Sequence, residues 1–234
     1  MKVLHPKERV AFCFSGQVRT LERCYETLAT TLFSKIKYPI DIFCHFYENP
    51  SKAPQEEYLV QNLLSPKIIE FCSPPVFKND KIQKMHSHRD AGAPLAHTIS
   101  VLNQSYSLMK ANDLKKKYEN ENGFKYHTVF RIRPDQLYFG ELENLDNILE
   151  DQIYVPDHDW HLGGINDRFC FGKSETVDKF SQIFLELDSM VAMGKFHPET
   201  MAKNICQKHN ICVVKTDIKC ERVREDGTII PIHY

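Results

Sequence analysis

The sequence lacks the features that mark several protein classes. It has no apolar stretch of the about 18 residues needed to cross a membrane, and its first ten residues, MKVLHPKERV, contain no signal-peptide core. It has no excess of one charge, because 30 Lys and Arg against 31 Asp and Glu leave a formal net charge of -1. A general nucleic-acid binder or a polybasic membrane-surface binder needs an excess of cations. We therefore expect a cytoplasmic protein with no membrane span and no nucleic-acid partner.

The eight cysteines lack the spacing of a metal or redox motif. No pair is spaced C-x-x-C, which argues against a zinc knuckle or a thioredoxin-like site. Several lie inside the apolar runs AFCF, DIFCHF and RFCF, where a free cysteine packs as a small apolar side chain. We therefore favour core packing over disulfide bonds, and a reducing compartment.

Strand and helix patterns alternate along a chain that is 42% apolar and 11% aromatic, too apolar to be disordered. The expected strands cover residues 10–14, 40–47, 67–72, 128–132, 152–155, 168–171 and 211–216. The expected helices cover residues 20–33, 55–64, 94–119 and 174–191, and one more opens at Pro198. This order predicts one α/β domain over residues 1–234, with a doubly wound, mixed but mostly parallel central sheet flanked by helices.

Weaker patterns lie between and after these elements. Residues 73–93 hold two prolines and many polar side chains, so we expect a surface loop or lid without a packed element. The run Lys115–Lys117 is interpreted as an exposed helix end, and the tail after residue 216 as polar. The long helix should end at Asn122-Gly123 and bury one apolar stripe, made of Leu95, Ile99, Leu102, Tyr106 and Met109.

The turn after the first strand is a candidate phosphate site, because ligands of open α/β sheets bind at the carboxyl ends of strands. It reads SGQVRT, and we assign substrate binding to Ser15, Gly16, Gln17 and Arg19. A small residue, a glycine and an arginine before a helix suit an anion through backbone N–H groups, the helix dipole and a guanidinium. The alternative is an ordinary turn with Thr20 as N-cap.

The segment RIRPD ends the fourth strand. Strand alternation places Arg131, Arg133 and Asp135 on one face and Ile132 on the other. Such charges are costly to bury without a ligand or mutual pairing. A diphosphate would bind the two arginines, and a divalent metal bridging it would bind the carboxylate. The alternative is a structural Arg–Asp network.

The loop PDHDWHLGGINDRF follows the fifth strand and combines an aromatic platform with a flexible Gly-Gly pair. An indole stacks on a sugar ring, so we assign substrate binding to Trp160, Gly163, Gly164 and Asn166. Asp167, directly before a strand, is the candidate general base. A polar stripe of the long helix, Ser100, Asn103, Gln104 and Ser107, is interpreted as a solvated face, with lining of the ligand cleft as the alternative.

The order SGQVRT, DIFCHFY, VFRIRPD, GGINDRFCFG and FHPE resembles small glycosyltransferase-like proteins of GT-A type, over roughly residues 10–218. Such proteins occur in bacterial surface-polysaccharide gene sets and in large viruses that glycosylate their capsids. The resemblance implies a Rossmann-like GT-A fold and a nucleotide-sugar donor, most often a UDP-sugar. It also implies a metal, Mn²⁺ or Mg²⁺, held by Asp135 and by a histidine late in the chain. For that histidine we favour His197 over His233. Asp135 alone matches the family's D-x-D, so the arginines could neutralise the diphosphate instead.

The resemblance also gives the expected reaction. A sugar would move from a nucleotide-diphosphate donor to a hydroxyl of a glycan or glycoprotein, with inversion expected and with Asp167 as the base. Two alternatives remain open at this point. One is a nucleotidyltransferase or phosphotransferase using the same cleft, against which the missing glycine-rich phosphate loop argues. The other is a non-catalytic glycan-binding module.

Overall fold

A seven-stranded sheet lies at the centre of the structure, a computed structural model that describes residues 8–232. Its strand order is β3-β2-β1-β4-β7-β6-β8. The strands are β1 (Val10–Gly16), β2 (Ile40–Tyr47), β3 (Ile68–Cys72), β4 (Thr128–Ile132), β6 (Gln152–Pro156), β7 (Cys170–Gly172) and β8 (Cys212–Thr216). All neighbouring strands are parallel except β7, which is antiparallel to both β4 and β6. The predicted mixed, mostly parallel sheet is confirmed.

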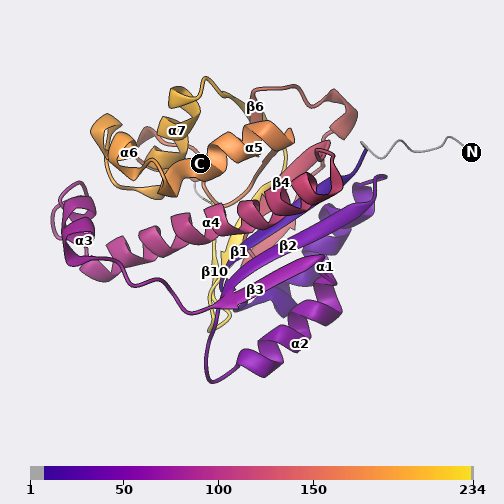
Figure 1. Cartoon of the computed structure of the whole chain (residues 1–234), viewed down its shortest axis with the longest axis horizontal. Coiled ribbons are helices and arrows are strands. Elements are labelled where there is room, and N and C mark those ends of the chain that lie inside the picture. Colours follow the sequence, from indigo (N-terminus) through magenta and orange to yellow (C-terminus); the bar gives the residue numbers. More distant parts are fainter. Residues whose placement is uncertain (1–7, 233–234) are drawn as a thin grey trace, which may run out of the picture.

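Helices cover both faces of this sheet, and α4 crosses one of them diagonally (Figure 1). The helices are α1 (Leu21–Thr31), α2 (Ala53–Leu64), α3 (Asn79–His86), α4 (Leu95–Asn122), α5 (Ser174–Phe180), α6 (Leu187–Met193) and α7 (Pro198–Lys208). The alternation of β1 explains the two layers. Phe12 and Phe14 pack in the same cluster as Leu21 and Leu28 of α1, whereas Cys13 packs with Ala111 of α4.

A second, three-stranded sheet was not predicted. It has the order β10-β9-β5 and consists of β5 (Gln136–Phe139), β9 (Lys219–Val223) and β10 (Ile229–Ile230). The tail after residue 216 was interpreted as polar, whereas the structure forms β9 there and buries Cys220 and Val223. A five-residue strand with two buried side chains leaves little periodicity to detect. Its pairing with β5 carries the C-terminal segment back to the end of β4.

Two helical predictions need correction. Residues 73–93 do contain a packed element, because α3 buries Met85 completely against the core that includes Leu102 of α4. The predicted helix over 174–191 is three pieces, with a 3₁₀ turn at Ser181–Phe184 between α5 and α6. The predicted starts and stops hold better: α4 ends at Asn122, before a left-handed Gly123, and α7 begins at Pro198.

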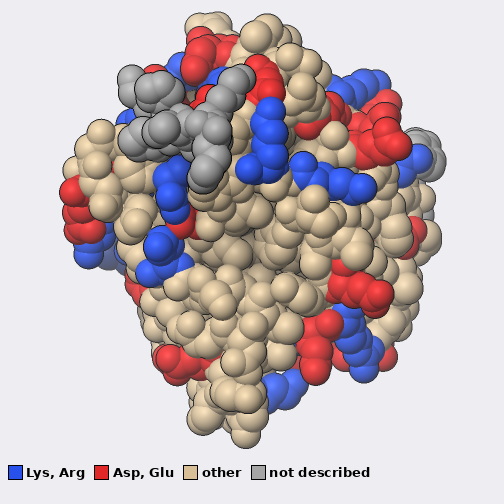
Figure 2. Space-filling view, turned by 90° about the vertical axis from the view of Figure 1, so that its right-hand side faces the viewer, with Lys and Arg blue, Asp and Glu red and all other residues tan. Residues whose placement is uncertain are grey.

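The cysteines agree with the core-packing interpretation. All eight are free thiols; six are buried, Cys72 is half-buried and Cys212 is exposed. Within residues 8–232, no helix combines the length and the apolarity needed to cross a membrane. On the face that Figure 2 shows, acidic and basic side chains are interspersed. No patch of a single charge extends across that face.

Helix α4 buries polar side chains whose burial could not be predicted from its sequence. The predicted apolar stripe is only partly correct, since Leu102 is buried but Leu95 is exposed. The prediction of an exposed Lys115 is wrong: the side chain is fully buried. Its Nζ donates to Asp178 Oδ1 at 2.7 Å, to Ser174 Oγ at 2.5 Å and to Glu119 Oε2 at 3.1 Å. A lysine is stable there because two carboxylates and a hydroxyl replace its water.

Replacing Lys115 with methionine should therefore destabilise the protein by about 3–5 kcal/mol, because Glu119 and Asp178 lose their buried cation and keep only their ion pairs with Lys125, which is partly exposed. Urea unfolding followed by circular dichroism measures the change. Lys117 is the matched control: it lies on the same helix but is exposed, and its Nζ lies 3.9 Å from Glu121 Oε1. Lys117→Met should change stability by less than about 0.5 kcal/mol. Equal effects of the two substitutions would contradict the assigned role of Lys115.

Candidate anion-binding cavity

A cavity of about 590 Å³ opens where β1, β2 and β4 end. Its wall carries five arginines and two acids, an excess of three positive charges. The lining residues are Ser15, Gly16, Gln17, Arg19, Tyr47, Pro74, His97, Ser100, Asn103, Gln104, Arg131, Arg133, Pro134, Asp135, Arg222, Arg224 and Glu225. The predicted binding residues of the β1 turn and of RIRPD thus share one cavity. Its volume and charge suit a phosphorylated small molecule.

The turn after β1 is held in place by helix α4. Gly16 has φ +117°, a conformation that favours glycine, and its N–H donates to Ser107 Oγ at 2.9 Å. Arg19 lies further along the turn, where its Nε donates to Gln17 Oε1 at 2.7 Å. Its Nη1 donates to Asp135 Oδ2 at 3.2 Å, so the β1 turn and the end of β4 are directly joined.

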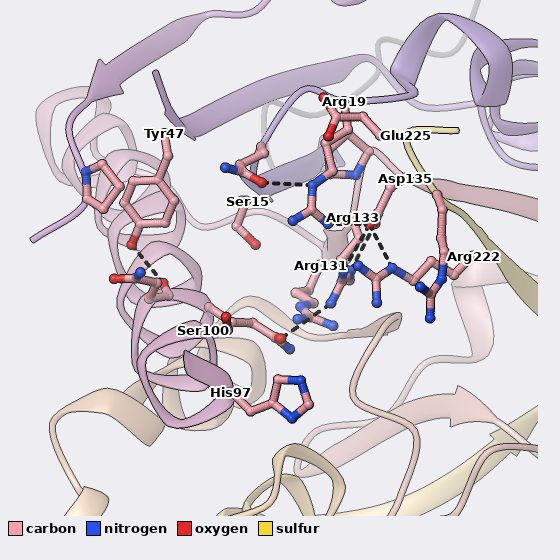
Figure 3. Close-up of a pocket in the computed structure, with 17 residues that line it drawn as sticks. Ser15, Arg19, Tyr47, His97, Ser100, Arg131, Arg133, Asp135, Arg222 and Glu225 are labelled. Atoms are coloured by element: carbon pink, nitrogen blue, oxygen red, sulfur yellow. Dashed lines mark hydrogen bonds and ion pairs between the residues drawn. The ribbon is translucent and has the colours of Figure 1, made fainter. Parts of the chain in front are cut away.

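Asp135 is the centre of an arginine cluster made of Arg19, Arg133 and Arg222 (Figure 3). Arg133 binds both carboxylate oxygens, with Nε to Oδ1 at 3.0 Å and Nη2 to Oδ2 at 2.9 Å. Arg222 Nε donates to Oδ2 at 3.2 Å. Burial alone would raise the pKa of Asp135, but the arginines, Arg133 foremost, hold it far below its usual range. Asp135 is therefore a carboxylate that orients guanidinium groups around the cavity.

Arg131 is different, because it takes no part in this cluster. It extends beside Arg133, on the side of the cavity that faces Ser100 and His97 of α4 (Figure 3). Its side chain is only 2% exposed, and its Nε and Nη1 have no hydrogen-bond partner among the residues that the structure describes. Burial lowers the pKa of Arg131, and the charge of Asp167 acts in the opposite direction. A buried guanidinium with unused donors is costly, and an anionic ligand in the cavity would satisfy it.

Asp167 is not part of the cavity wall but lies close to Arg131, on whose pKa its charge acts. Together with Gln104 and Arg131 it lines a second, much smaller hollow of about 20 Å³, and both of these neighbours also line the main cavity. Gln104 Nε2 donates to Asp167 Oδ2, and Gln104 Oε1 accepts from Arg133 Nη1 at 3.3 Å. Gln104 thus connects Asp167 to Arg133 of the arginine cluster, and Asp167 belongs to none of the ion pairs of that cluster.

The other predicted residues of the glycine loop do not line this cavity. Trp160 Nε1 donates to the carbonyl of Pro156 at 2.7 Å, and Lys215 Nζ lies 5.0 Å from the centroid of the indole ring system. Asn166 is buried and donates to the carbonyl of His158 at 3.1 Å. A Cβ at Gly164 would lie 2.3 Å from the backbone carbon of Glu199, so glycine permits close packing on α7. Gly163 accepts from Lys203 Nζ at 2.8 Å.

The residues assigned to Mn²⁺ or Mg²⁺ do not fit that metal. The oxygens of Asp135 accept five hydrogen bonds, four of them from arginines, which leaves no lone pair for a cation. Three guanidinium groups at this carboxylate would also repel a divalent ion. His197 is not part of the cavity wall, and its Nδ1 lies 2.8 Å from Glu199 Oε2. His233 lies outside the described residues.

Several residues of the cavity were missed by reasoning from the sequence. Arg222, Arg224 and Glu225 come from β9 and the segment after it, and the arginines at alternate positions were the available signal. The polar stripe of α4 was taken for a solvated face, yet Ser100, Asn103 and Gln104 line the cavity. Their place there depends on how α4 lies across the sheet, which its own sequence does not specify.

The fold and this cavity define a mixed α/β protein with an arginine-rich ligand site at the carboxyl end of its sheet. The chain belongs to the family described as Domain of unknown function (DUF7796), whose model matches residues 5–216. Among solved structures it is similar to a crystal structure of mouse xyloside xylosyltransferase 1 in its apo form. That match has 12% sequence identity and a TM-score of 0.45, and covers 89% of this chain and 84% of that chain. No curated protein sequence matches.

Proposed function

We propose that the chain is a glycosyltransferase whose cavity binds the diphosphate of a nucleotide sugar, with a UDP-sugar as the expected donor. The observation that carries the proposal is Arg131, a fully buried guanidinium with unused donors at the wall of a cavity with three excess positive charges. A structural Arg–Asp network describes Arg133 and Asp135 but leaves Arg131 unexplained. A diphosphate supplies charge of the opposite sign and oxygen acceptors for the free N–H groups.

In the proposed reaction, the oxygen of an acceptor hydroxyl attacks the anomeric carbon of the donor sugar. The bond from that carbon to the β-phosphate oxygen breaks, and its electron pair leaves with the nucleoside diphosphate. Arg131 and Arg133 stabilise the charge that develops on the leaving group. Asp167 takes the proton of the acceptor hydroxyl, because the oxygens of Asp135 are already engaged by arginines. The acceptor is a glycan or glycoprotein.

In this proposal the arginines neutralise the charge of the diphosphate, and no metal ion at Asp135 is needed. Calorimetric titration with UDP should therefore give the same Kd in excess EDTA and in excess Mn²⁺. The affinity should fall as salt is added, since the attraction is between charges at a solvent-accessible site. A requirement for Mn²⁺ would contradict the arginine assignment.

The reaction class is tested by incubating the protein with a panel of nucleotide sugars and identifying the products. We expect slow release of nucleoside diphosphate, as water replaces the missing acceptor. Release of pyrophosphate or nucleoside monophosphate would indicate a nucleotidyltransferase or phosphotransferase instead. Binding of glycans with no consumption of any donor would indicate a binding module.

A further inference from the structure

A second cluster of polar side chains lies outside the cavity wall, on β2 and β3. His45 pairs with Glu70 in the parallel ladder, and Cys72 follows two residues later, so all three side chains project from one face of the sheet. One ligand atom from each lies within 4.8 Å of the other two. His45 Nε2 is 3.3 Å from Cys72 Sγ and 4.0 Å from Glu70 Oε1.

The hydrogen bonds of Ser107 assign the tautomer of His45. The hydroxyl of Ser107 accepts the N–H of Gly16 at 2.9 Å and donates to the carbonyl oxygen of His45 at 3.0 Å. Its single proton is then used, so the 2.9 Å contact with His45 Nδ1 needs an N–H on that nitrogen. Nε2 therefore carries a lone pair, which faces Cys72 and Glu70. Metal-binding histidines are oriented in this way, with the second nitrogen donating to a neighbouring group.

The charges around the cluster favour a cation. Two carboxylates and one lysine act on Cys72: after burial, Glu70 and Glu48 raise the pKa of its thiol, and Lys110 lowers it. Two acids against one lysine leave a net negative charge beside the thiol.

The donor set selects the kind of metal. A nitrogen, a sulfur and a carboxylate oxygen suit Zn²⁺, whereas Mg²⁺ and Mn²⁺ prefer oxygen ligands only. In a tetrahedral zinc site, with Zn–S of about 2.3 Å and Zn–N of about 2.0 Å, the sulfur and the nitrogen lie about 3.5 Å apart. The observed separation is 3.3 Å. The side chain of Glu70 is 39% exposed, so water reaches the fourth position.

We propose that His45, Glu70 and Cys72 bind one Zn²⁺ ion, with water as the fourth ligand. Binding converts the Cys72 thiol to a thiolate and releases its proton to solvent. The ion would join β2 to β3, and through His45 and Ser107 it would brace Gly16, the glycine of the β1 turn. The proposal does not depend on what the arginine cavity binds.

The test uses the full chain, kept reduced, stripped with a chelator and then titrated with Zn²⁺ by calorimetry and with Co²⁺ by absorption spectroscopy. We expect one ion per chain and a sulfur-to-cobalt charge-transfer band. Cys72→Ser should lose that band and weaken Zn²⁺ binding by about 100-fold or more. The matched control is Cys212→Ser, because Cys212 is an exposed thiol on β8, and it should retain both properties.

A second measurement needs no variant. In the wild-type protein, Zn²⁺ should slow alkylation of Cys72 by iodoacetamide relative to Cys212, as followed by peptide mass spectrometry. Equal protection of the two thiols, or Zn²⁺ affinity unchanged in Cys72→Ser, would overturn the proposal. The proposal would also be overturned if the wild-type chain took up less than one Zn²⁺ ion per molecule. The Cys72 thiol would then be only a hydrogen-bond partner of the His45 imidazole.

Discussion

Replacing Arg131 with methionine is expected to stabilise the ligand-free protein while removing its affinity for UDP. Methionine fills a similar volume and needs no hydrogen-bond partners, so the cost of a buried guanidinium with unused donors disappears. We expect the free energy of unfolding to rise by about 1–4 kcal/mol, measured by urea denaturation without ligand. Binding of UDP should weaken by about 2–5 kcal/mol, or about 30-fold or more in Kd.

The opposite signs of these two changes are what make the experiment decisive. If Arg131 had only a structural role, its replacement would destabilise the protein, and the affinity for the ligand would fall only as a consequence of that lost stability. Arg131→Lys is the control for charge, since it keeps the cation and loses the fork of donors. It should bind UDP with an affinity between those of the wild type and Arg131→Met. A Met variant that is less stable than the wild type and binds UDP normally would refute the ligand role.

Replacing Asp167 with asparagine is expected to abolish turnover and leave donor binding intact. Asparagine keeps an oxygen that accepts from Gln104, so the local contact survives while the proton acceptor is lost. Loss of a general base lowers the rate by about 10²–10⁴-fold. Affinity for UDP should be unchanged or slightly higher, because a negative charge near Arg131 is removed. Donor turnover is measured as nucleoside diphosphate release with acceptor present, and affinity by calorimetry.

Asp157→Asn provides the matched control for this result. Asp157 lies in the same loop but is exposed and forms an ion pair with Lys215 at 2.7 Å. Its replacement should leave both turnover and UDP affinity at wild-type values. Near-normal turnover of Asp167→Asn would remove Asp167 from the role of base. Parallel losses in the two variants would point to disturbance of the loop.

Local sequence patterns predicted the cavity best where a single strand end determines the outcome. In RIRPD, the two-residue period of a strand sends Arg131 and Arg133 to the cavity and Ile132 to the apolar core, as expected. The turn SGQVRT was also located correctly, because parallel strands end at one edge of their sheet. Both features can be predicted once the position and the direction of a single strand are known.

The glycine loop shows where such reasoning stops. Trp160 and Asn166 have the composition of a sugar site, yet their polar groups bind backbone carbonyls of the same loop region. The types of residue in a loop indicate which interactions are possible. The path of the backbone determines which partners the side chains actually contact. The same limit explains Lys115, whose two carboxylate partners on α4 and α5 make burial stable.

The sequence by itself determined the α/β layering, the strand ends that carry charge and the packing role of most cysteines, because these follow from periodicity within short segments. Only the tertiary structure decided which charges meet. Arg222 arrives from β9, 87 residues after Asp135, and His45 faces Cys72 across two strands. Such pairings depend on long-range strand order and on the angle of α4, which no local pattern encodes. The charge state and the free donors of the cavity are therefore properties of the assembled fold.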